Sequence, residues 1–600
     1  MCGITGYTGS LKDRNVIKAM TTALAHRGPD AEDFFSDGGI TFGFRRLAII
    51  DLSTGGQPMS FGAYTIVFNG EIYNYRELRE ELSLRGDTFK TTSDTEVLLH
   101  AFAAYGPQCL NKLDGMFAFA VWNAQAKELF IARDQLGIKP LYYTHSGDSF
   151  VFGSEIKALL KHPSVRREPN YGALESYFRY RYVVGEETFF SGIKSLSPGH
   201  YLTVKEGSEP QSVEYWSLST KEKKDEGEAY YVREVRARLE KTVERMMHAD
   251  VPVGSYLSGG LDSSIVVGLM ASLKKTELHT FTVGFKGDEQ NEFAEARAVS
   301  EMWGTTHHEL ALEPREYFDG LETLIGYKDA PLSVPNELPL WRMSQALRNY
   351  VTVVLSGEGA DELFGGYGRI FRAAHIYDRD HLEEPFGEYL LRLYSYTPDE
   401  WLSRILPKDM RGRESSATRH IADIFSRIQH MPHEEQALYF FQRVHLSGLL
   451  HRLDTPTMAA SVEGRVPYVD KELIEFVHSI PFSHKVRWQE GGEKAALGLS
   501  AAEISEKLDT PKYLLRKACA DLVPKDVLSR KKVGFPVPLE AWFRGPFREH
   551  ARRILTDTRT CDRNIFPTEL LRADDFYESA APLTIWMMVN VELFMRQYFD

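Results

Sequence analysis

The sequence of 600 residues predicts two domains of different fold class: an α+β domain of packed antiparallel sheets with helices, then an α/β domain with a parallel sheet and helical additions. Three observations predict this division. Residues 1–205 contain many short runs of β-branched and aromatic residues, which Gly, Asp and Asn punctuate. Residues 206–228 are polar and charged, as is typical of a linker. From residue 229 to residue 600, strand-like runs alternate with longer helical patterns.

The first domain should consist mainly of strands with a few amphipathic helices. Apolar residues recur with helical spacing in two stretches, Val16–Leu24 and Tyr75–Leu84. The expected strands are Tyr64–Phe68, Met116–Trp122, Leu129–Ala132 and Phe150–Phe152. Short strands with turn residues between them indicate two stacked antiparallel sheets.

The second domain should begin with a strand, a loop and a long helix. We expect a strand at Val251–Leu257, a loop at Ser258–Ser264, a helix at Ile265–Leu273 and further strands at His279–Phe285 and Val351–Leu355. Strands that alternate with helices favour a parallel sheet covered by helices. Residues of roughly 370–450 and 495–600 are mostly helical in pattern.

The composition excludes several classes of protein. There are 71 basic and 84 acidic side chains, a formal net charge of −13, which disfavours broad attraction to nucleic-acid backbones. The longest late apolar run, Ser579–Val591, has 13 residues, fewer than the ~20 that a membrane-spanning helix needs. The four cysteines form no metal-spaced pair, and the first residues lack the pattern of a secretory signal. We therefore expect a cytoplasmic protein with no nucleic-acid partner and no membrane anchor.

Cys2 directly follows the initiator Met, which aminopeptidases remove before small residues. The processed chain would then begin with a thiol beside a free α-amine, which can accept the thiol proton directly or through a water. Asn69 and Gly70, at the end of an expected strand, offer an amide side chain and an unobstructed backbone N–H to a developing oxyanion. On composition alone, Cys2 could equally be a small second residue and Asn-Gly a hairpin turn.

Five sequence segments favour a catalytic role for Cys2 over the structural alternative. They are Cys2-Gly3-Ile4, His26-Arg27-Gly28-Pro29-Asp30, Arg46-Leu47-Ala48-Ile49, Asn69-Gly70-Glu71-Ile72-Tyr73-Asn74 and Ser93-Asp94-Thr95-Glu96. Their order and rough spacing resemble the class II glutamine amidotransferases over about the first 200 residues. The resemblance implies an N-terminal-nucleophile fold, in which Cys2 attacks the side-chain amide of glutamine and releases ammonia.

The resemblance also implies roles for individual residues. Asn69 and Gly70 would form the oxyanion hole. Glutamine would be bound by Arg46 at its α-carboxylate, by Glu71 and Asp94 at its α-amine, and by Ile49. We expect His26 to be structural, because the α-amine already supplies the base, and Arg27 with Asp30 could be a buried stabilising pair.

A second candidate site follows the first strand of the second domain. The loop Ser258-Gly259-Gly260-Leu261-Asp262-Ser263-Ser264 opens an apolar helix, whose N-terminus favours an anion such as phosphate. No Lys follows the glycines, so the loop differs from the GxxxxGK[ST] phosphate loop. It resembles instead the pyrophosphate loop of the N-type ATP pyrophosphatases, which cut ATP between the α- and β-phosphates.

An acidic, Gly-rich loop, Ser356 to Tyr367, follows the strand Val351–Leu355, where ligands of open α/β sheets gather. Asp361 with Asp262 could hold Mg²⁺ against pyrophosphate, because this ion prefers oxygen ligands. Glu358 is left for proton or substrate chemistry. Alone, each of these two loops could be an ordinary turn.

Both loops, with Val462–Asp470 and Arg530–Pro536, resemble the synthetase domain of glutamine-dependent asparagine synthetases. The family usually has Ala where this chain has Gly464, and Asp470 could simply cap the helix that starts at Lys471. The resemblance assigns Leu257, Ser258, Gly260, Asp262, Ser263, Ser264, Val283, Ser356 and Gly357 to ATP. It places Lys532 against phosphate charge and Glu358 near the substrate or the attacking ammonia.

Together these features predict an ATP-dependent amide synthesis. Glutamine, aspartate and ATP with Mg²⁺ would give asparagine, glutamate, AMP and pyrophosphate, through an acyl-adenylate that ammonia attacks after crossing a largely apolar internal passage. The same chemistry could act on another carboxylate, in a peptide, a cell-wall precursor or a secondary metabolite. A β-lactam synthetase fits less well, because that relative lacks the terminal Cys and has Tyr where this chain has Glu358. A non-catalytic storage protein would show decayed sites. A homodimer is what the family suggests.

Overall fold

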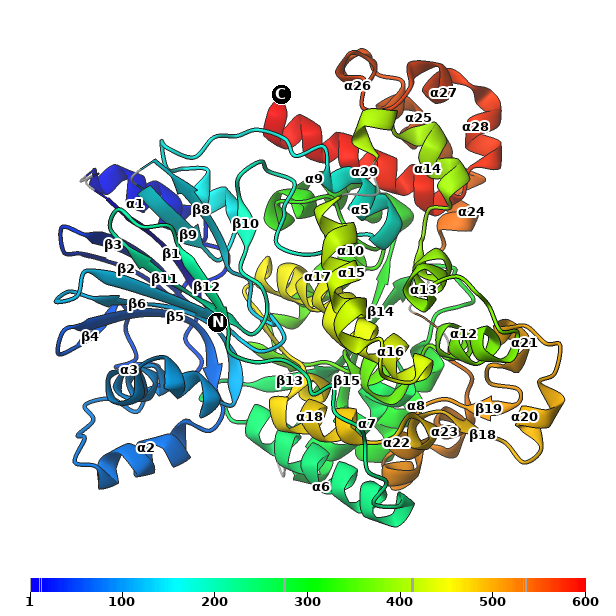
Figure 1. Ribbon diagram of the computed structural model, residues 1–600, viewed down its shortest axis with the longest axis horizontal. Helices are drawn as coiled ribbons and strands as arrows, with labels where there is room; N and C mark the ends of the chain where they lie inside the picture. Colours follow the sequence, from blue (N-terminus) through cyan, green and yellow to red (C-terminus); the bar gives the residue numbers. More distant parts are fainter. Residues whose placement is uncertain are drawn as a thin grey trace.

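The computed structural model describes residues 2–9, 11, 13–147, 149–273, 277–411, 415–532, 534 and 537–600. Its N-terminal part contains two antiparallel sheets that face each other, at the left of Figure 1. The first has the strand order β10-β8-β9-β1-β3-β2 and the second the order β12-β11-β7-β6-β5-β4. Side chains such as Ile4, Phe42, Val67 and Phe152 fill the space between them. The prediction of two stacked antiparallel sheets is confirmed.

The strands of the first sheet are β1 (Gly3–Thr8), β2 (Ala31–Ser36), β3 (Ile40–Arg46), β8 (Tyr142–Ser146), β9 (Ser149–Gly153) and β10 (Lys194–Ser195). Those of the second are β4 (Met59–Phe61), β5 (Tyr64–Ile72), β6 (Gly115–Asn123), β7 (Glu128–Arg133), β11 (His200–Lys205) and β12 (Gln211–Glu214). The helices α1 (Arg14–Thr22), α2 (Tyr75–Leu84) and α3 (Asp94–Tyr105) lie outside the sheets, followed by α4 (Ile156–Leu159) and α5 (Ala173–Tyr180). Each strand and helix that the sequence predicts in this part is present, with small shifts at the ends.

The predicted linker, residues 206–228, differs from expectation at both of its ends. Residues Gln211–Glu214 form β12, which pairs antiparallel with β11 at the edge of the second sheet. An edge strand is held by main-chain hydrogen bonds and can be polar on both faces, so its sequence shows no strand pattern. The helix α6 (Glu228–Met246) already begins at the last residue of the predicted linker.

The C-terminal part is built on a parallel sheet of order β15-β14-β13-β16-β17, as predicted. Its strands are β13 (Val253–Tyr256), β14 (His279–Phe285), β15 (Thr306–Leu312), β16 (Val353–Leu355) and β17 (Glu463–Arg465). Helices α7 (Leu261–Leu273), α8 (Phe293–Trp303), α9 (Pro314–Lys328) and α10 (Glu337–Leu347) connect or cover them. The carboxyl ends of β13 and β16 lie side by side, which brings the loops after them together.

Further helices surround this sheet, most of them within the two regions that have a helical pattern. Before β17 these are α11 (Ala360–Phe364), α12 (Gly368–Arg379), α13 (Phe386–Tyr394), α14 (Asp399–Ile405), α15 (Ser416–Ile428), α16 (His433–Phe440) and α17 (Leu446–Met458). After it come α18 (Lys471–Ser479), α19 (Phe482–Lys485), α20 (Gly492–Ala495), α21 (Ala501–Ile504), α22 (Tyr513–Ala518), α23 (Lys525–Ser529), α24 (Leu539–Phe543), α25 (Pro546–Leu555), α26 (Thr558–Arg563), α27 (Thr568–Arg572), α28 (Asp574–Ser579) and α29 (Pro582–Phe599). The short strands β18 (Arg487–Trp488) and β19 (Asp509–Thr510) pair with each other. Asp470 caps α18 by accepting from the Leu473 amide, as the sequence suggests.

Most of the late apolar run lies in α29, which is buried in the C-terminal part. Among the helices of the described residues, none combines the length and the apolar character that crossing a bilayer requires.

Candidate active sites

The first candidate site lies at the start of β1, between the two sheets. Cys2 is buried there, and its backbone N–H donates to Asn69 Oδ1 at 3.0 Å. The amide nitrogen of Asn69 is buried and has no hydrogen-bond partner within the described part of the chain. Burial raises the pKa of the Cys2 thiol, and a hydrogen bond from the Leu47 backbone opposes part of that rise. The side chain that the sequence assigns to the oxyanion hole is therefore next to Cys2 with a free donor.

Gly70 follows Asn69 in β5 and pairs with Phe117 of β6. A Cβ atom at this position would lie 2.0 Å from the Met116 carbonyl oxygen, which no side chain can tolerate. The close approach of β6 thus explains why glycine stands beside the candidate donor.

Two carboxylates lie buried behind this position. Asp94 is at the start of α3 and accepts from the Ile72 backbone N–H at 3.0 Å, while Glu71 is in β5. Burial raises the pKa of Asp94 to about 6, despite the hydrogen bond from Ile72. Burial and the nearby Glu463 raise the pKa of Glu71 well above its ordinary value. A cationic ligand such as an α-ammonium group would relieve this clustering of acids.

Arg46 ends β3 and has its guanidinium tied to a loop. It donates to the backbone carbonyls of Ile50 at 3.4 Å and Leu52 at 3.3 Å, and to that of Asp51. Ile49 is buried in the same segment, and its carbonyl accepts from the Asp250 backbone. Both residues therefore lie on the segment that continues from β3, the strand that pairs with β1.

The possible pair of Arg27 with Asp30 is not formed. Arg27 is 1% exposed and bonds to Glu155 at 3.0 Å and to Asp454 of α17 at 2.9 Å. Asp30 is exposed and accepts from the Ala48 backbone N–H at 2.8 Å. Arg27 also donates to the Cys2 carbonyl at 3.2 Å, so a buried cation links the first site to the C-terminal part. His26 contacts Glu155 at 2.9 Å.

The second candidate site is a cavity of about 1010 Å³ over the carboxyl ends of β13, β14 and β16. All but one of the residues that the sequence assigns to ATP line it. These are Leu257, Ser258, Gly260, Asp262, Ser263, Val283, Ser356 and Gly357. The hydroxyls of Ser258 and Ser263 lie 3.1 Å apart at the start of α7. The two loops touch here, because a Cβ atom on Gly357 would lie 2.9 Å from the Ser263 amide nitrogen.

Ser264 is the exception. Its hydroxyl donates to the Gly260 carbonyl at 2.6 Å, within the first turn of α7, and the side chain does not line the cavity. Since α7 begins at Leu261, not at the predicted Ile265, Ser264 belongs to the helix and turns away from the site.

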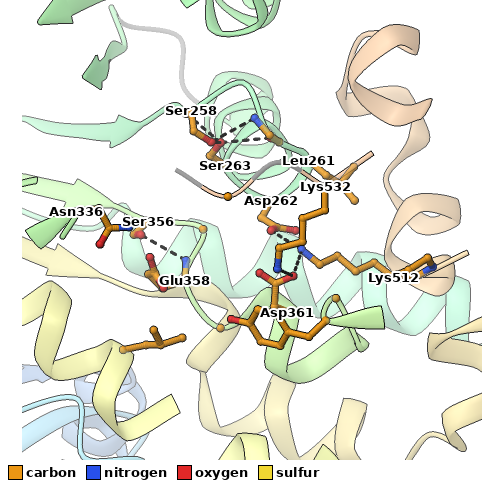
Figure 2. Close-up of a pocket in the computed structure, with 18 of the residues that line it drawn as sticks. Ser258, Leu261, Asp262, Ser263, Asn336, Ser356, Glu358, Asp361, Lys512 and Lys532 are labelled. Atoms are coloured by element: carbon orange, nitrogen blue, oxygen red, sulfur yellow. Dashed lines mark hydrogen bonds and ion pairs between the residues drawn. The ribbon is translucent and has the colours of Figure 1, made fainter. Parts of the chain in front are cut away.

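Asp262 and Asp361, the two acidic residues expected to hold a metal, both form ion pairs with lysines in this structure. Lys512 Nζ lies 2.5 Å from Asp262 and 2.6 Å from Asp361, and Lys532 Nζ lies 2.7 Å from Asp361 (Figure 2). Burial alone would raise the pKa of Asp361, but the two ammonium groups hold it below its ordinary value. Of the residues named in the sequence motif 530–536, Val533, Phe535 and Pro536 lie outside the described residues.

Sequence reasoning missed Lys512. It is buried, precedes α22 and has a φ of 54°, a left-handed conformation that few side chains adopt. It lies 250 residues after Asp262. Its left-handed backbone and its burial are structural signals only, and the surrounding sequence has no motif that would have singled it out.

Sequence reasoning also missed Arg452. This residue of α17 forms an ion pair with Glu358 inside the cavity. The Glu358 amide donates to the Ser356 hydroxyl at 3.3 Å, which fixes the loop after β16 (Figure 2). Glu358 is thus a carboxylate held by an arginine from a distant helix, beside the loops that follow β13 and β16.

The two candidate sites are joined through β17. The carbonyl of Arg465 accepts from the Ser356 N–H at 2.9 Å, at the edge of the cavity. Its guanidinium bonds to Glu463 at 2.6 Å and reaches Glu71 of the first site at 3.9 Å. One short strand therefore contacts both sites.

Comparisons with known proteins agree with this two-site arrangement. A model of the glutamine amidotransferase domain matches residues 1–216, and a model of asparagine synthase matches residues 234–594. The chain is 35% identical to "Asparagine synthetase [glutamine-hydrolyzing] 1" of Bacillus subtilis, over 93% of this chain and 90% of that protein. It is 34% identical to "Asparagine synthetase [glutamine-hydrolyzing] 3" of the same organism, over 89% and 87%. A putative relative from Mycobacterium tuberculosis with the same activity in its name is 33% identical, over 91% and 88%.

Proposed function

The chain belongs to the glutamine-hydrolysing asparagine synthetase family, and on that premise we propose that it converts aspartate, glutamine and ATP into asparagine, glutamate, AMP and pyrophosphate. The observation that carries the proposal is that one chain holds both halves of the chemistry. Cys2 with the free Asn69 amide forms one half, and the loops around Asp262 and Glu358 form the other.

In the first half, Cys2 would be the N-terminal residue after removal of Met1, which lies outside the described residues. Its α-amine would take the thiol proton, and the thiolate would attack the side-chain carbonyl of glutamine. The Asn69 amide and the Gly70 backbone N–H would stabilise the oxyanion, whose collapse would break the C–N bond and release ammonia carrying the proton from the α-amine. Water would then hydrolyse the thioester to give glutamate and the free Cys2 thiol. Glu71 and Asp94 would hold the α-ammonium group, whose charge favours their ionised forms.

In the second half, a carboxylate must become an electrophile. Attack of the acceptor carboxylate on the α-phosphate of ATP gives an acyl-adenylate and releases pyrophosphate. Ser258, Ser263 and the start of α7 would bind the released phosphates, and Lys512 and Lys532 would neutralise their charge. Leu257 and Val283 would border the base. Ammonia then attacks the acyl carbon and AMP leaves, while Glu358 would accept a proton from the attacking nitrogen.

The residues present fit a Mg²⁺ ion. Asp262 Oδ1 is buried and has no hydrogen-bond partner among the residues that the structure describes, so a hard cation would satisfy it. Asp262 and Asp361 would hold the ion, and Lys512, which contacts both carboxylates, would supply further positive charge beside the phosphates. When bound, Mg²⁺ neutralises charge on the leaving pyrophosphate.

Coupling within one chain has a chemical reason. Ammonia is mostly ammonium at neutral pH, and ammonium has no lone pair with which to attack. We propose that ammonia crosses the contact between the two parts, where α17 reaches Arg27 through Asp454 and Glu358 through Arg452. The homodimer and the cytoplasmic location stay predictions from the family resemblance and the composition.

Product analysis tests the proposed function. The purified enzyme is incubated with glutamine, ATP and Mg²⁺ and a panel of carboxylates that includes aspartate, and amides, AMP and pyrophosphate are measured. We expect asparagine and AMP in equal amounts with aspartate. If AMP and an amide form with another acid but not with aspartate, the acceptor is that other acid and the proposal of aspartate is wrong.

A further inference from the structure

The cavity extends well beyond the nucleotide loops. Its far side is lined by Tyr394, Tyr396, Phe441, His445 and, from the N-terminal part, Arg181. None of these residues belongs to the sequence motifs that carry the two family resemblances. These five residues form what we call the far compartment of the cavity.

Arg181 is the residue of this compartment that carries a permanent positive charge. Its guanidinium stacks on the Tyr396 ring, 3.7 Å from the ring centroid. Its Nε is buried and has no hydrogen-bond partner in the described part of the chain. No carboxylate of the described residues forms an ion pair with it. An anionic ligand would satisfy this buried N–H and pair with the guanidinium charge.

The other cations of the cavity differ from Arg181. Lys512, Lys532, Arg452 and Arg530 each pair with a carboxylate. Arg369 and Lys531 line the cavity without an ion pair among the described residues, but both are exposed to solvent. Arg516 also lines the cavity, partly buried and without an ion pair among the described residues, but its guanidinium donates to the backbone carbonyls of Pro511 and Leu528. Arg181 is therefore the partly buried cation whose guanidinium is left to receive an anionic group.

The backbone at Arg181 adopts an unusual conformation. It ends α5 with φ of 70°, at a position where helices usually have glycine. A left-handed arginine is held there by the packing of α5 against the C-terminal part, where the Tyr177 hydroxyl donates to the Leu332 carbonyl at 2.7 Å. Strained backbone of this kind clusters at ligand-binding sites.

One helix face connects this compartment to Glu358. His445, Leu449 and Arg452 are spaced by four and three residues, and all three line the cavity. Arg452 pairs with Glu358, whereas His445 at the other end bonds to the Tyr394 hydroxyl at 2.6 Å. Residues Phe441–His445 form a π-helical turn, a feature frequent at functional sites. Burial and the cations Arg181 and Arg452 lower the pKa of His445, so this imidazole stays neutral.

We propose that Arg181 binds the non-reacting carboxylate of the acceptor, which is the α-carboxylate when the acceptor is aspartate. This inference rests on the proposed function and assigns part of its acceptor site. The planar guanidinium can bind a carboxylate through two parallel hydrogen bonds while Tyr396 supports its face. The side-chain carboxylate of aspartate would then point toward the nucleotide loops and Glu358. A residue of the N-terminal part would thereby select the substrate of the C-terminal part.

Ammonia-dependent synthesis by the full-length enzyme tests this role, because it bypasses the glutamine site. The variants are Arg181→Gln, Arg181→Lys, and Arg179→Gln as a matched control that removes an arginine two residues away, outside the cavity. We expect Arg181→Gln to raise KM for aspartate about 10- to 100-fold, the loss typical of a charge-assisted hydrogen-bonded pair. KM for ATP, glutaminase activity and the Arg179→Gln enzyme should stay near wild type, and Arg181→Lys should recover part of the loss.

A second measurement separates binding from folding. β-Alanine has the amine and the reacting carboxylate of aspartate but lacks the α-carboxylate. Arg181→Gln should lower the preference for aspartate over β-alanine, measured as the ratio of kcat/KM values from AMP release. An unchanged KM for aspartate, or equal losses with both acceptors, would overturn the role of Arg181. A wild-type enzyme that makes no asparagine would instead refute the proposed function, and the assignment with it.

Discussion

The buried contact between Arg27 and Asp454 makes the sharpest prediction about how the two halves work together. Asp454→Asn removes a carboxylate that serves two cations, Arg27 at 2.9 Å and Lys139 at 3.5 Å. All three side chains are at most 3% exposed. The change leaves Lys139 without an ion-pair partner in the described part of the chain, whereas Arg27 keeps Glu155.

The size of the effect follows from burial. Breaking a buried ion pair by removing one partner costs about 3–5 kcal/mol, because the remaining charge is uncompensated. We expect the lower end, about 3 kcal/mol, since Glu155 still neutralises Arg27. Since 1.4 kcal/mol corresponds to a factor of ten, the equilibrium constant for the docked arrangement of the two parts should fall about 100-fold.

The matched control is another ion pair between the same two parts, at the surface. Arg179 and Asp399 lie 2.6 Å apart, with Asp399 75% exposed. Exposed pairs contribute about 0–1 kcal/mol, so Asp399→Asn should change little.

The assay measures the amount of asparagine formed per glutamate released, with glutamine as nitrogen source. Asp454→Asn should lower this ratio while glutamine hydrolysis and synthesis from added ammonium continue. Asp399→Asn should keep the wild-type ratio. If the two variants gave the same ratio, or if Asp454→Asn lost both half-reactions equally, the reasoning from the buried contact would be refuted.

Four further predictions concern the separate sites. Cys2→Ala should abolish the use of glutamine and spare synthesis from ammonium salt, and equal loss of both would contradict two separate sites. Lys512→Met should slow pyrophosphate release about 10- to 100-fold with unchanged glutaminase activity, because it removes the ammonium group between Asp262 and Asp361; an unaffected rate would remove Lys512 from the site. Removal of Mg²⁺ with EDTA should stop pyrophosphate release and leave glutamine hydrolysis intact, and persistence of both would exclude the metal role. Because burial raises the pKa of Asp94 to about 6, this carboxyl group gains a proton below that pH, so KM for glutamine should rise on acidification; a flat profile between pH 5 and 7 would contradict its role. The same raised pKa means that the stability contributed by protonated Asp94 is lost as pH rises from about 4 through about 6.

Much of the fold could be predicted because the strands and helices have clear local patterns. The strands β5, β6 and β7 and the helix α2 appear where their apolar periodicity predicts them. Apolar periodicity does not predict a strand that forms only because it pairs with a neighbouring strand. The strand β17 consists of Glu463, Gly464 and Arg465, and it exists because it pairs with β16. A sequence of two charged residues and a glycine does not resemble a strand.

The candidate sites show the same division. Residues in contiguous motifs, such as Ser258–Ser263 and Asn69–Gly70, could be named from the sequence, and the structure places them around the cavity and beside Cys2. Ser264 was assigned with them, but the helix turns it away. Arg452 and Lys512 could not be named, because each comes from a distant helix region that carries no motif.

The amino-acid sequence by itself determined the two kinds of chemistry, since a phosphate-binding loop or an oxyanion donor is built from neighbouring residues whose backbone sets their geometry. Only the tertiary structure decided which cations face those groups. Packing brought Lys512 between two carboxylates, Arg27 of the first half to Asp454 of the second, and Arg181 into the lining of the second cavity. The physical reason is that charge interactions act through space and strengthen with burial, whereas sequence patterns report only interactions between residues a few positions apart.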